Sequence, residues 1–350
     1  MFFKKKGLIG LDIGSSFIKG AQINDTKEGY ELAIFDMVPT HSDVIKDGII
    51  TDKAKLAASI KELLQKIGLK KNNAVISISG SSSVIVKKIT TPIMTEEELS
   101  ASMKYEVEQY VPFNINDVEI DFQILGSSAE EGQMDVVLVA VNKKVMNDYV
   151  DAIKMAGLDV AIVDADSFAI CNAYEVNYDM FETNIISLVN IGASTTSITV
   201  LRNGVPIYTK YSDIGSNRHT EALERSTGVS REDAERLKRG QLIENVSTEV
   251  VQEIINSASD QIYAEIFRAF EYFKGIVGEE EISKIILSGG AALVKGFPEM
   301  MEERLGINVE VMDPFRQIKI HGNLDSSYLK DIAPMAAIAV GLAIRRIGDR

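Results

Sequence analysis

Residues 8–16 read Leu-Ile-Gly-Leu-Asp-Ile-Gly-Ser-Ser, and a similar run, Ser-Leu-Val-Asn-Ile-Gly-Ala-Ser-Thr, returns half a chain later at residues 187–195. Each copy is an apolar strand, a turn of small residues and a second apolar strand, at residues 17–23 or 197–201. Asn190 stands in the second copy where Asp12 stands in the first. The pattern predicts two related β-hairpins, one in each half of the chain. Two unrelated hairpins are the alternative on the repeat alone.

Strands alternate with helices in both halves, which is typical of an α/β fold. Apolar spacing and capping residues predict helices at residues 54–67, 95–110, 144–156, 231–239, 250–274 and 298–305. Alternating residues predict strands at 75–79, 136–141 and 282–287. The segment Val84–Gly157 has the pattern of a small α/β insertion. Ile332–Ile347 is expected to be a buried C-terminal helix, because it is shorter than a membrane span requires.

Composition narrows the class of protein. The chain has 350 residues, 45% of them hydrophobic and 25% charged, which indicates a globular protein of two or more domains. A net charge of −14 argues against a nucleic-acid partner and against a broad hold on an anionic membrane. The single cysteine, Cys171, cannot form an intramolecular disulfide, so a reducing cytoplasm is expected. We expect no signal peptide and no direct membrane insertion.

The first predicted turn is suited to binding phosphate. Gly14, Ser15 and Ser16 would offer backbone N–H groups and hydroxyls without obstruction by large side chains. A carboxylate such as Asp12 beside phosphates makes sense if Mg²⁺ lies between them, through bound water. Lys19 is placed to reach a β- or γ-phosphate. A turn-capping aspartate and a solvated strand lysine are the plainer alternatives for these two residues.

Two further glycine segments extend this pattern to a nucleotide. The second turn, Gly192, Ala193, Ser194 and Thr195, would hold the same phosphates from the opposite domain. Gly289 and Gly290 follow a predicted strand, where the backbone can approach a flat ring such as adenine. A plain loop is the alternative for this last pair. The three segments in this order predict an ATP site with Mg²⁺.

These segments resemble the two phosphate motifs and the adenosine motif of the superfamily that includes actin, sugar kinases and heat-shock chaperones. Within it the chain is similar to the PilM family of type IV pilus assembly proteins, with the cell-division protein FtsA as a more distant relative. The run Glu106-Val-Glu-Gln-Tyr-Val-Pro-Phe113, followed by Asp121-Phe-Gln-Ile-Leu-Gly126, carries the closer likeness. It implies an actin-like (ribonuclease H-like) two-domain α/β fold with an inserted small α/β subdomain.

The resemblance also implies a division of the chain. The expected parts are 1–83 and 158–184 in subdomain 1A, 84–157 in the inserted subdomain 1C, 185–222 and 281–328 in subdomain 2A, 223–280 in subdomain 2B, and 329–350 as a C-terminal helix returning to 1A.

Further site residues follow from the resemblance alone. Glu235 and Lys238 match a helical pair that brackets the base and ribose in relatives. Gly215 and Asn217 match positions that approach the nucleotide. The segment 163–166 lies where relatives orient an attacking water, a role for Asp164 or Asp166.

One departure concerns catalysis. Relatives usually have aspartate at the position of Asn190, which together with Asp12 would face the Mg²⁺ ion. Asparagine removes one carboxylate from the network of metal and water. The expected activity is therefore ATP binding with weak or no hydrolysis.

The resemblance implies a partner, the cytoplasmic tail of a PilN-like inner-membrane protein. The expected groove adjoins the inserted subdomain, with Tyr110, Val111 and Phe113 nearby, although each side chain can equally serve to pack a helix end. Binding there would hold the protein at the inner face of the cytoplasmic membrane without an anchor of its own. An FtsA-like cell-division or filament-forming ATPase and a small-molecule kinase are the alternatives, and self-association stays open.

Overall fold

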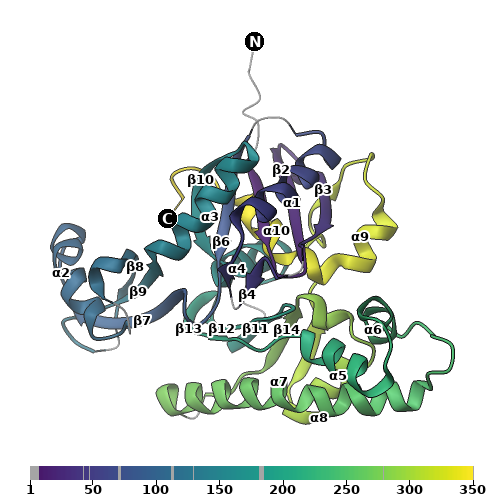
Figure 1. The fold of residues 1–350 in the computed structure, drawn as a ribbon. Coiled ribbons are helices and arrows are strands. Elements are labelled where there is room, and N and C mark those ends of the chain that lie inside the picture. Colours follow the sequence, from purple (N-terminus) through teal and green to yellow (C-terminus); the bar gives the residue numbers. More distant parts are fainter. Residues whose placement is uncertain are drawn as a thin grey trace.

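The computed structural model describes residues 8–41, 43–46, 48–69, 72–111, 114–128, 130–180, 185–278 and 280–349. Two large β-sheets, each with helices packed on it, form two domains, and a smaller three-stranded unit projects to one side (Figure 1). The expected helices and strands are confirmed with bounds shifted by a few residues, except for the C-terminal helix, which is described below.

The first sheet has the strand order β10-β6-β1-β2-β3-β16. Its strands are β1 Ile9–Ile13, β2 Phe17–Thr26, β3 Gly29–Pro39, β6 Asn73–Ile78, β10 Asp159–Ala165 and β16 Lys319–Ile320. A short hairpin, β4 (Ile45–Lys46) and β5 (Ile49–Ile50), follows β3. Strand β1 pairs antiparallel with β2 and parallel with β6, so the first glycine turn leaves the middle of the sheet.

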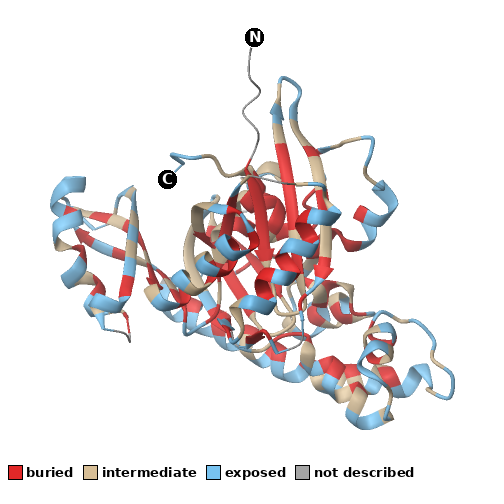
Figure 2. Cartoon of the chain, turned by 45° about the horizontal axis from the view of Figure 1, so that its top comes forward, coloured by how far each residue is buried: buried red, intermediate tan, exposed pale blue. Residues whose placement is uncertain are grey.

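Helices cover both faces of this sheet because successive strand residues point to opposite sides. Ile9 and Leu11 face the core formed with α1 (Lys53–Lys66) and α3 (Lys143–Ala156). On the other face, α4 (Asp166–Asn177) packs beside α10 (Ala337–Ile344). The contact with α10 is close enough that a Cβ at Gly10 would lie 2.5 Å from the carbonyl oxygen of Ala339. Buried residues accordingly concentrate in this sheet and its helices (Figure 2).

The second sheet has the order β13-β12-β11-β14-β15. Its strands are β11 Ile185–Ile191, β12 Thr196–Arg202, β13 Val205–Ser212, β14 Lys284–Ser288 and β15 Asn308–Val311. The helices of this half are α5 Asn217–Thr227, α6 Arg231–Lys238, α7 Thr248–Val277 and α8 Phe297–Leu305. Strand β11 pairs antiparallel with β12 and parallel with β14, as β1 does with β2 and β6. The internal repeat predicted from sequence is therefore a repeat of structure.

The projecting unit comprises β7 (Val84–Pro92), α2 (Glu96–Glu108), a 3₁₀ turn η1 (Ile115–Asp117), β8 (Val118–Ser127) and β9 (Gln133–Asn142), with the sheet order β7-β9-β8. It has its own core, centred on Leu99, Val107 and Leu138. Helix α3 follows β9 but packs against α1 and β10 in the first domain.

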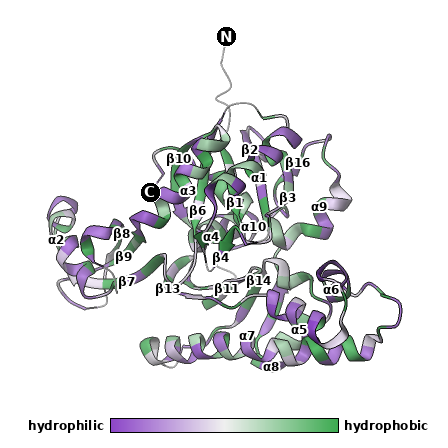
Figure 3. Ribbon diagram, viewed as in Figure 1, coloured by the Kyte–Doolittle hydropathy of each residue, from purple (hydrophilic) through white to green (hydrophobic). Residues whose placement is uncertain are grey.

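The C-terminal segment is more broken than expected. It forms α9 (Ser326–Ile332), a 3₁₀ turn η3 (Ala333–Ala336) and α10, because Pro334 cannot continue a regular helix. By length and composition alone Ser326–Ile344 could cross a membrane, but 72% of its apolar window is buried inside the fold. The apolar colouring of α10 against the first sheet in Figure 3 reflects this packing.

Candidate functional site

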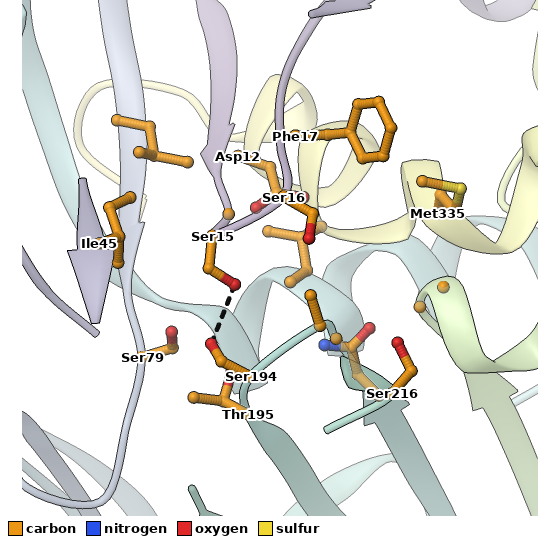
Figure 4. Close-up of a pocket in the computed structure, with 18 of the residues that line it drawn as sticks. Asp12, Ser15, Ser16, Phe17, Ile45, Ser79, Ser194, Thr195, Ser216 and Met335 are labelled. Carbon is orange, nitrogen blue, oxygen red and sulfur yellow. Dashed lines mark hydrogen bonds between the residues drawn. The ribbon is translucent and has the colours of Figure 1, made fainter. Parts of the chain in front are cut away.

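A cleft lies between the two large sheets, where the turns of the two related hairpins approach each other (Figure 4). The following residues singled out from sequence line it: Asp12, Gly14, Ser15, Ser16, Lys19, Asp166, Asn190, Gly192, Ala193, Ser194, Thr195, Asn217, Glu235, Lys238, Gly289 and Gly290. Gly215 lines the wider groove beside this cleft, and Asp164 lines neither.

The first turn is closed by its own backbone and held by the end of β3. The Gly14 N–H donates to the carbonyl of Phe17 at 3.0 Å, and a Cβ at Gly14 would lie 3.0 Å from that same oxygen. The Thr40 hydroxyl donates to the Gly14 carbonyl at 2.7 Å. The Thr40 N–H donates to the carbonyl of Ser16 at 2.9 Å. The small residues therefore allow a tight turn whose position β3 fixes.

The second turn has the same closure. The Gly192 N–H donates to the carbonyl of Thr195 at 2.9 Å. The start of α5 holds this turn, because the Asn217 N–H donates to the carbonyl of Ala193 at 2.8 Å. A Cβ at Gly215 would lie 2.6 Å from that carbonyl oxygen. Gly215 thus lets α5 approach the turn closely, which is a structural reason for glycine at this position.

The two turns touch at their tips. The hydroxyl oxygens of Ser15 and Ser194 are 2.9 Å apart and share a hydrogen bond (Figure 4). Hydroxyl donors from two domains therefore meet at one point of the cleft, with a turn glycine beside each. Such an arrangement is suited to an anion held between the domains.

Asp12 and Lys19 form an ion pair at the base of the first hairpin. They are direct cross-strand partners in the β1–β2 register, and Lys19 Nζ lies 2.6 Å from Asp12 Oδ2. Both side chains are largely buried, with 10% and 12% of their surface exposed for Asp12 and Lys19. The lysine proposed to reach a phosphate is thus already held in place by the carboxylate, with both groups at the cleft wall.

Asn190 repeats the position of Asp12 in the second domain, since it pairs with Ser197 as Asp12 pairs with Lys19. Its side chain is buried, and the Ser288 hydroxyl donates to its Oδ1 at 3.2 Å. Within the described ranges, no group of three or more His, Cys, Asp or Glu side chains gathers as a metal site. Asp12 and Asn190 therefore suit a Mg²⁺ ion that is held mainly by phosphates and water, with Asp12 as the one charged protein group beside it.

The structure separates the two candidate water-orienting aspartates. Asp166 is the first residue of α4 and lines the cleft, whereas the carboxylate of Asp164 lies 3.5 Å from Arg345 Nε. Burial raises the pKa of Asp166 to about 7. The Tyr211 hydroxyl acts to lower this pKa, and the negative charge of Asp12 acts to raise it further. Burial also raises the pKa of Asp164, which Arg345 partly offsets.

Glu235 and Lys238 lie one turn apart on α6, with Lys238 Nζ 2.8 Å from Glu235 Oε1. Thr220 of α5 completes the group, because its hydroxyl donates to Glu235 Oε1 at 2.6 Å and accepts from Lys238 Nζ at 2.9 Å. Burial lowers the pKa of Lys238. Burial acts to raise the pKa of Glu235, but the charge and hydrogen bond of Lys238, together with the hydrogen bond from Thr220, outweigh it and hold that pKa below its usual value. Sequence reasoning missed Thr220, whose two partners lie on another helix.

The Gly289–Gly290 pair gives the cleft an unobstructed backbone wall. Gly289 has a φ of 86°, and a Cβ there would lie 2.3 Å from the carbonyl oxygen of Ile191. A Cβ at Gly290 would meet nothing within 4 Å. The chain after β14 therefore presses against β11 at one glycine and leaves space at the next, where a flat ring can lie against the backbone.

Other lining residues carried no signal in the sequence. Ser77 and Ser79 reach the cleft from the end of β6, Tyr149 from α3, Arg239 from the end of α6 and Met335 from η3. These elements lie far apart along the chain, so only the tertiary structure gathers the five residues.

Two sheet-and-helix domains, each sending a turn of small residues into a shared cleft, define an actin-like two-domain protein. The solved structure of MreB5 of Spiroplasma citri bound to ADP has this fold, with a TM-score of 0.53 and 11% identity over 98% of this chain and 96% of that one. A family model described as "Type IV pilus assembly protein PilM" matches residues 10–347, and the chain belongs to this family.

Individual relatives agree with this assignment. A chain of the solved "PilM-PilN type IV pilus biogenesis complex" is 26% identical, with a TM-score of 0.86, and the match covers 98% of this chain and 99% of that chain. The cell division protein FtsA of Bacillus subtilis (strain 168) is 22% identical in a match that covers 87% of this chain and 78% of FtsA. The resemblance to PilM and the actin-like fold expected from sequence are therefore confirmed.

Proposed function

We propose that this chain is a cytoplasmic, ATP-binding assembly protein of the type IV pilus platform, and that it binds the cytoplasmic tail of a PilN-like inner-membrane protein. The observation that carries the proposal is the match along 98% of the chain to a member of the PilM-PilN complex. Family membership over residues 10–347 supports it. The tail would hold the protein at the inner face of the membrane.

The cleft supports ATP as the ligand. The turns of residues 14–16 and 192–195 would hold the phosphates from opposite sides, with the hydroxyls of Ser15 and Ser194 donating to them instead of to each other. Glu235 and Lys238 would bracket the ribose and base, and Gly290 would lie under the ring. Asn217 also lines this cleft.

Hydrolysis is expected to be weak. Bound Mg²⁺ would supply charge stabilisation at the phosphates. Asp12 is the carboxylate placed to hold its water shell, while Asn190 is neutral and its amide oxygen already accepts from Ser288. Asp166 is the one of the two candidate aspartates that lines the cleft, and burial raises its pKa to about 7. The expectation of weak hydrolysis rests on Asn190, and ATP would then act mainly as a conformational ligand.

We place the partner site on the projecting unit, which forms the first part of the inserted segment 84–157. An extended peptide binds readily along an outer strand, whose backbone groups on one side lack a strand partner. Strand β8 is such an outer strand, while β7 at the opposite edge lies against β13 of the second sheet. The tail is therefore proposed to add along β8.

The side chains at the end of α2 differ in what they offer to a partner. The Lys87 ammonium lies 4.1 Å from the centre of the Tyr110 ring, and this ring is half-buried. Val111 is buried in the core of the unit, so it packs the helix end. Pro112 and Phe113 lie outside the described residues. Tyr110 is thus the aromatic residue proposed to contact the tail.

Calorimetric titration of the full chain with a synthetic peptide of the PilN tail tests the proposal. Binding of the peptide, with an affinity that changes on adding ATP and Mg²⁺, is the expected result, and a scrambled peptide is the control. Tyr110→Ala should weaken binding about tenfold, a ~1.4 kcal/mol loss. Tyr105→Ala is the matched control variant, since this tyrosine lies on α2 just before Tyr110 and has 76% of its surface exposed.

Two outcomes would count against this function. If neither variant changes the affinity, the partner site lies elsewhere on the chain. If the peptide does not bind at all and ATP drives sedimentable polymer, a filament-forming ATPase explains the fold better.

A further inference from the structure

The cleft continues past the two glycine turns, on the side away from the proposed nucleoside end. Met335 marks the nucleoside end, because the guanidinium of the residue that follows α6 donates to its sulfur at 3.9 Å. In Figure 4 the touching hydroxyls of Ser15 and Ser194 lie between Met335 and the opposite, far end of the cleft. Ile45 and Ser79 line this far end. A row of phosphates that starts at the nucleoside and passes between the turns therefore ends there.

The β4–β5 hairpin closes the far end of the cleft. Ile45 of β4 and Gly48 at the turn of the hairpin both line the cleft. Ile45 also lines the wider groove outside, so its side chain separates the two spaces. Gly48 has a φ of 77°, and a Cβ there would lie 2.9 Å from the carbonyl oxygen of Ser79. The turn of the hairpin is thus packed closely against the chain that follows β6, and together they form an end wall.

Tyr149 holds this wall from α3. Its side chain is buried in the core of the first domain, and its hydroxyl donates to the Gly48 carbonyl at 3.0 Å. Helix α3 also holds the chain just after the hairpin, because Lys53 at the start of α1 lies 2.7 Å from Asp148. Burial and the negative charge of Asp12 raise the pKa of Tyr149, so the hydroxyl keeps the proton that it donates. The hairpin is therefore fixed to α3 both at its turn and beyond its end.

Two serine hydroxyls at the end of β6 add hydrogen-bond donors to the far end. Ser77 and Ser79 both line the cleft, and in Figure 4 the Ser79 hydroxyl points into it. Among the residues that the structure describes, neither hydroxyl has a hydrogen-bond partner. A hydroxyl of this kind can donate to a phosphate oxygen at no cost to an existing bond.

We propose that the far end of the cleft holds the terminal phosphate and makes the site selective for a nucleoside triphosphate over a diphosphate. This inference rests on the proposed ATP site. Ser79 donates to the terminal phosphate, Ile45 bars that phosphate from the wider groove, and Tyr149 is a positioning residue that holds the hairpin in place. A diphosphate leaves the Ser79 hydroxyl unpaired, and a site built to bond one group discriminates against the analogue that lacks it.

Calorimetric titration of the full chain with ATP and, separately, with ADP, each with Mg²⁺, tests the selectivity. Ser79→Ala should weaken ATP binding about tenfold and leave ADP binding unchanged, because a hydrogen bond to a charged oxygen is lost. Ser82→Ala, at an exposed position of the following turn, should change neither.

Tyr149→Phe keeps the ring in the core and removes only the bond to the hairpin. It should lower the preference for ATP over ADP in the same direction as Ser79→Ala, by a smaller factor because it acts through the hairpin. Tyr263→Phe is the matched control, since the buried Tyr263 hydroxyl donates to the carbonyl of Phe297 in the second domain, away from the cleft. This control should leave the preference unchanged.

Hydrogen exchange in the nucleotide-free chain tests the anchoring by itself. The Thr51 N–H closes the hairpin by donating to the carbonyl of Val44 at 2.9 Å. It should exchange faster in Tyr149→Phe than in the natural chain or in Tyr263→Phe. Equal exchange, or an unchanged preference for ATP in Tyr149→Phe, would overturn the positioning role of Tyr149.

The remaining outcomes separate this inference from the ATP site on which it rests. If both nucleotides bind and Ser79→Ala weakens them equally or not at all, the far end does not hold the terminal phosphate, although the ATP site stands. If neither nucleotide binds the natural chain, the ATP site and this inference fail together. If Tyr149→Phe does not fold, the result for Ser79→Ala decides.

Discussion

Replacing Asp166 by asparagine measures how much a protonated carboxyl in the cleft contributes to stability. Asp166 has 4% of its surface exposed, and burial raises its pKa from an ordinary 3.8 to about 7. Asparagine has nearly the same shape and does not titrate. The difference in unfolding free energy between the natural chain and Asp166→Asn therefore reports this one group.

The sign follows from which state holds the proton. Below pH 3.8 the carboxyl is protonated in both states, so its stabilising contribution is complete. As the pH rises toward 7, the unfolded chain loses the proton and the folded chain keeps it, so stability falls. Each unit of pKa shift is worth about 1.4 kcal/mol, so the loss between about pH 5 and pH 8 is on the order of 3 kcal/mol.

Urea unfolding of both proteins across that pH range is the assay. His219 makes the subtraction necessary, because it is fully buried and burial lowers its pKa to about 3. A histidine with a lowered folded pKa loses stability as the pH falls below 6.5, which is the opposite trend. His219 lies in the second domain, so its effect should cancel in the difference.

The control is Asp159→Asn, at an exposed position at the start of β10. If the difference for Asp166→Asn is flat between about pH 5 and pH 8, Asp166 does not keep its proton in the folded protein, and the account of the cleft fails.

Three further outcomes are expected. Saturating ATP with Mg²⁺ should raise the melting temperature, because ligand at a hundredfold excess over Kd adds about 2.7 kcal/mol to the free energy of unfolding. Asp12→Ala should remove the Mg²⁺-dependent part of that rise. An unchanged melting temperature would argue against an ATP site. Asn190→Asp should increase the rate of ATP hydrolysis in a turnover assay, while the affinity for ATP stays within about tenfold. Slower hydrolysis in this variant would contradict the role given to Asn190. A turnover number of ~10 s⁻¹ in the natural chain, typical of enzymes, would contradict it too. Thr220→Val keeps the shape but removes the hydroxyl that bonds to both Lys238 and Glu235, so the pair is less firmly positioned. ATP affinity measured by calorimetry should then drop about tenfold, a ~1.4 kcal/mol effect, whereas Thr227→Val on the same helix should not change it.

Much of the fold was predictable because its signals are local. A hairpin turn closes through bonds between neighbours, such as Gly14 to Phe17 and Gly192 to Thr195. The two phosphate-type turns and the equivalence of Asp12 and Asn190 were therefore visible as a repeated pattern. The capping box at Thr95 and the glycine that ends α3 are local in the same sense.

The sequence by itself determined the two hairpins, the order of helices and strands, and most of the residues that line the cleft. Only the tertiary structure decided which aspartate faces the cleft. Asp164 and Asp166 are two residues apart, but Asp164 lies beside Arg345 and Asp166 lines the cleft. It also decided that Tyr211 reaches Ser167, 44 residues away along the chain. Contacts of this kind depend on how two domains pack against each other, and that packing is set by the whole buried surface rather than by any spacing in the sequence.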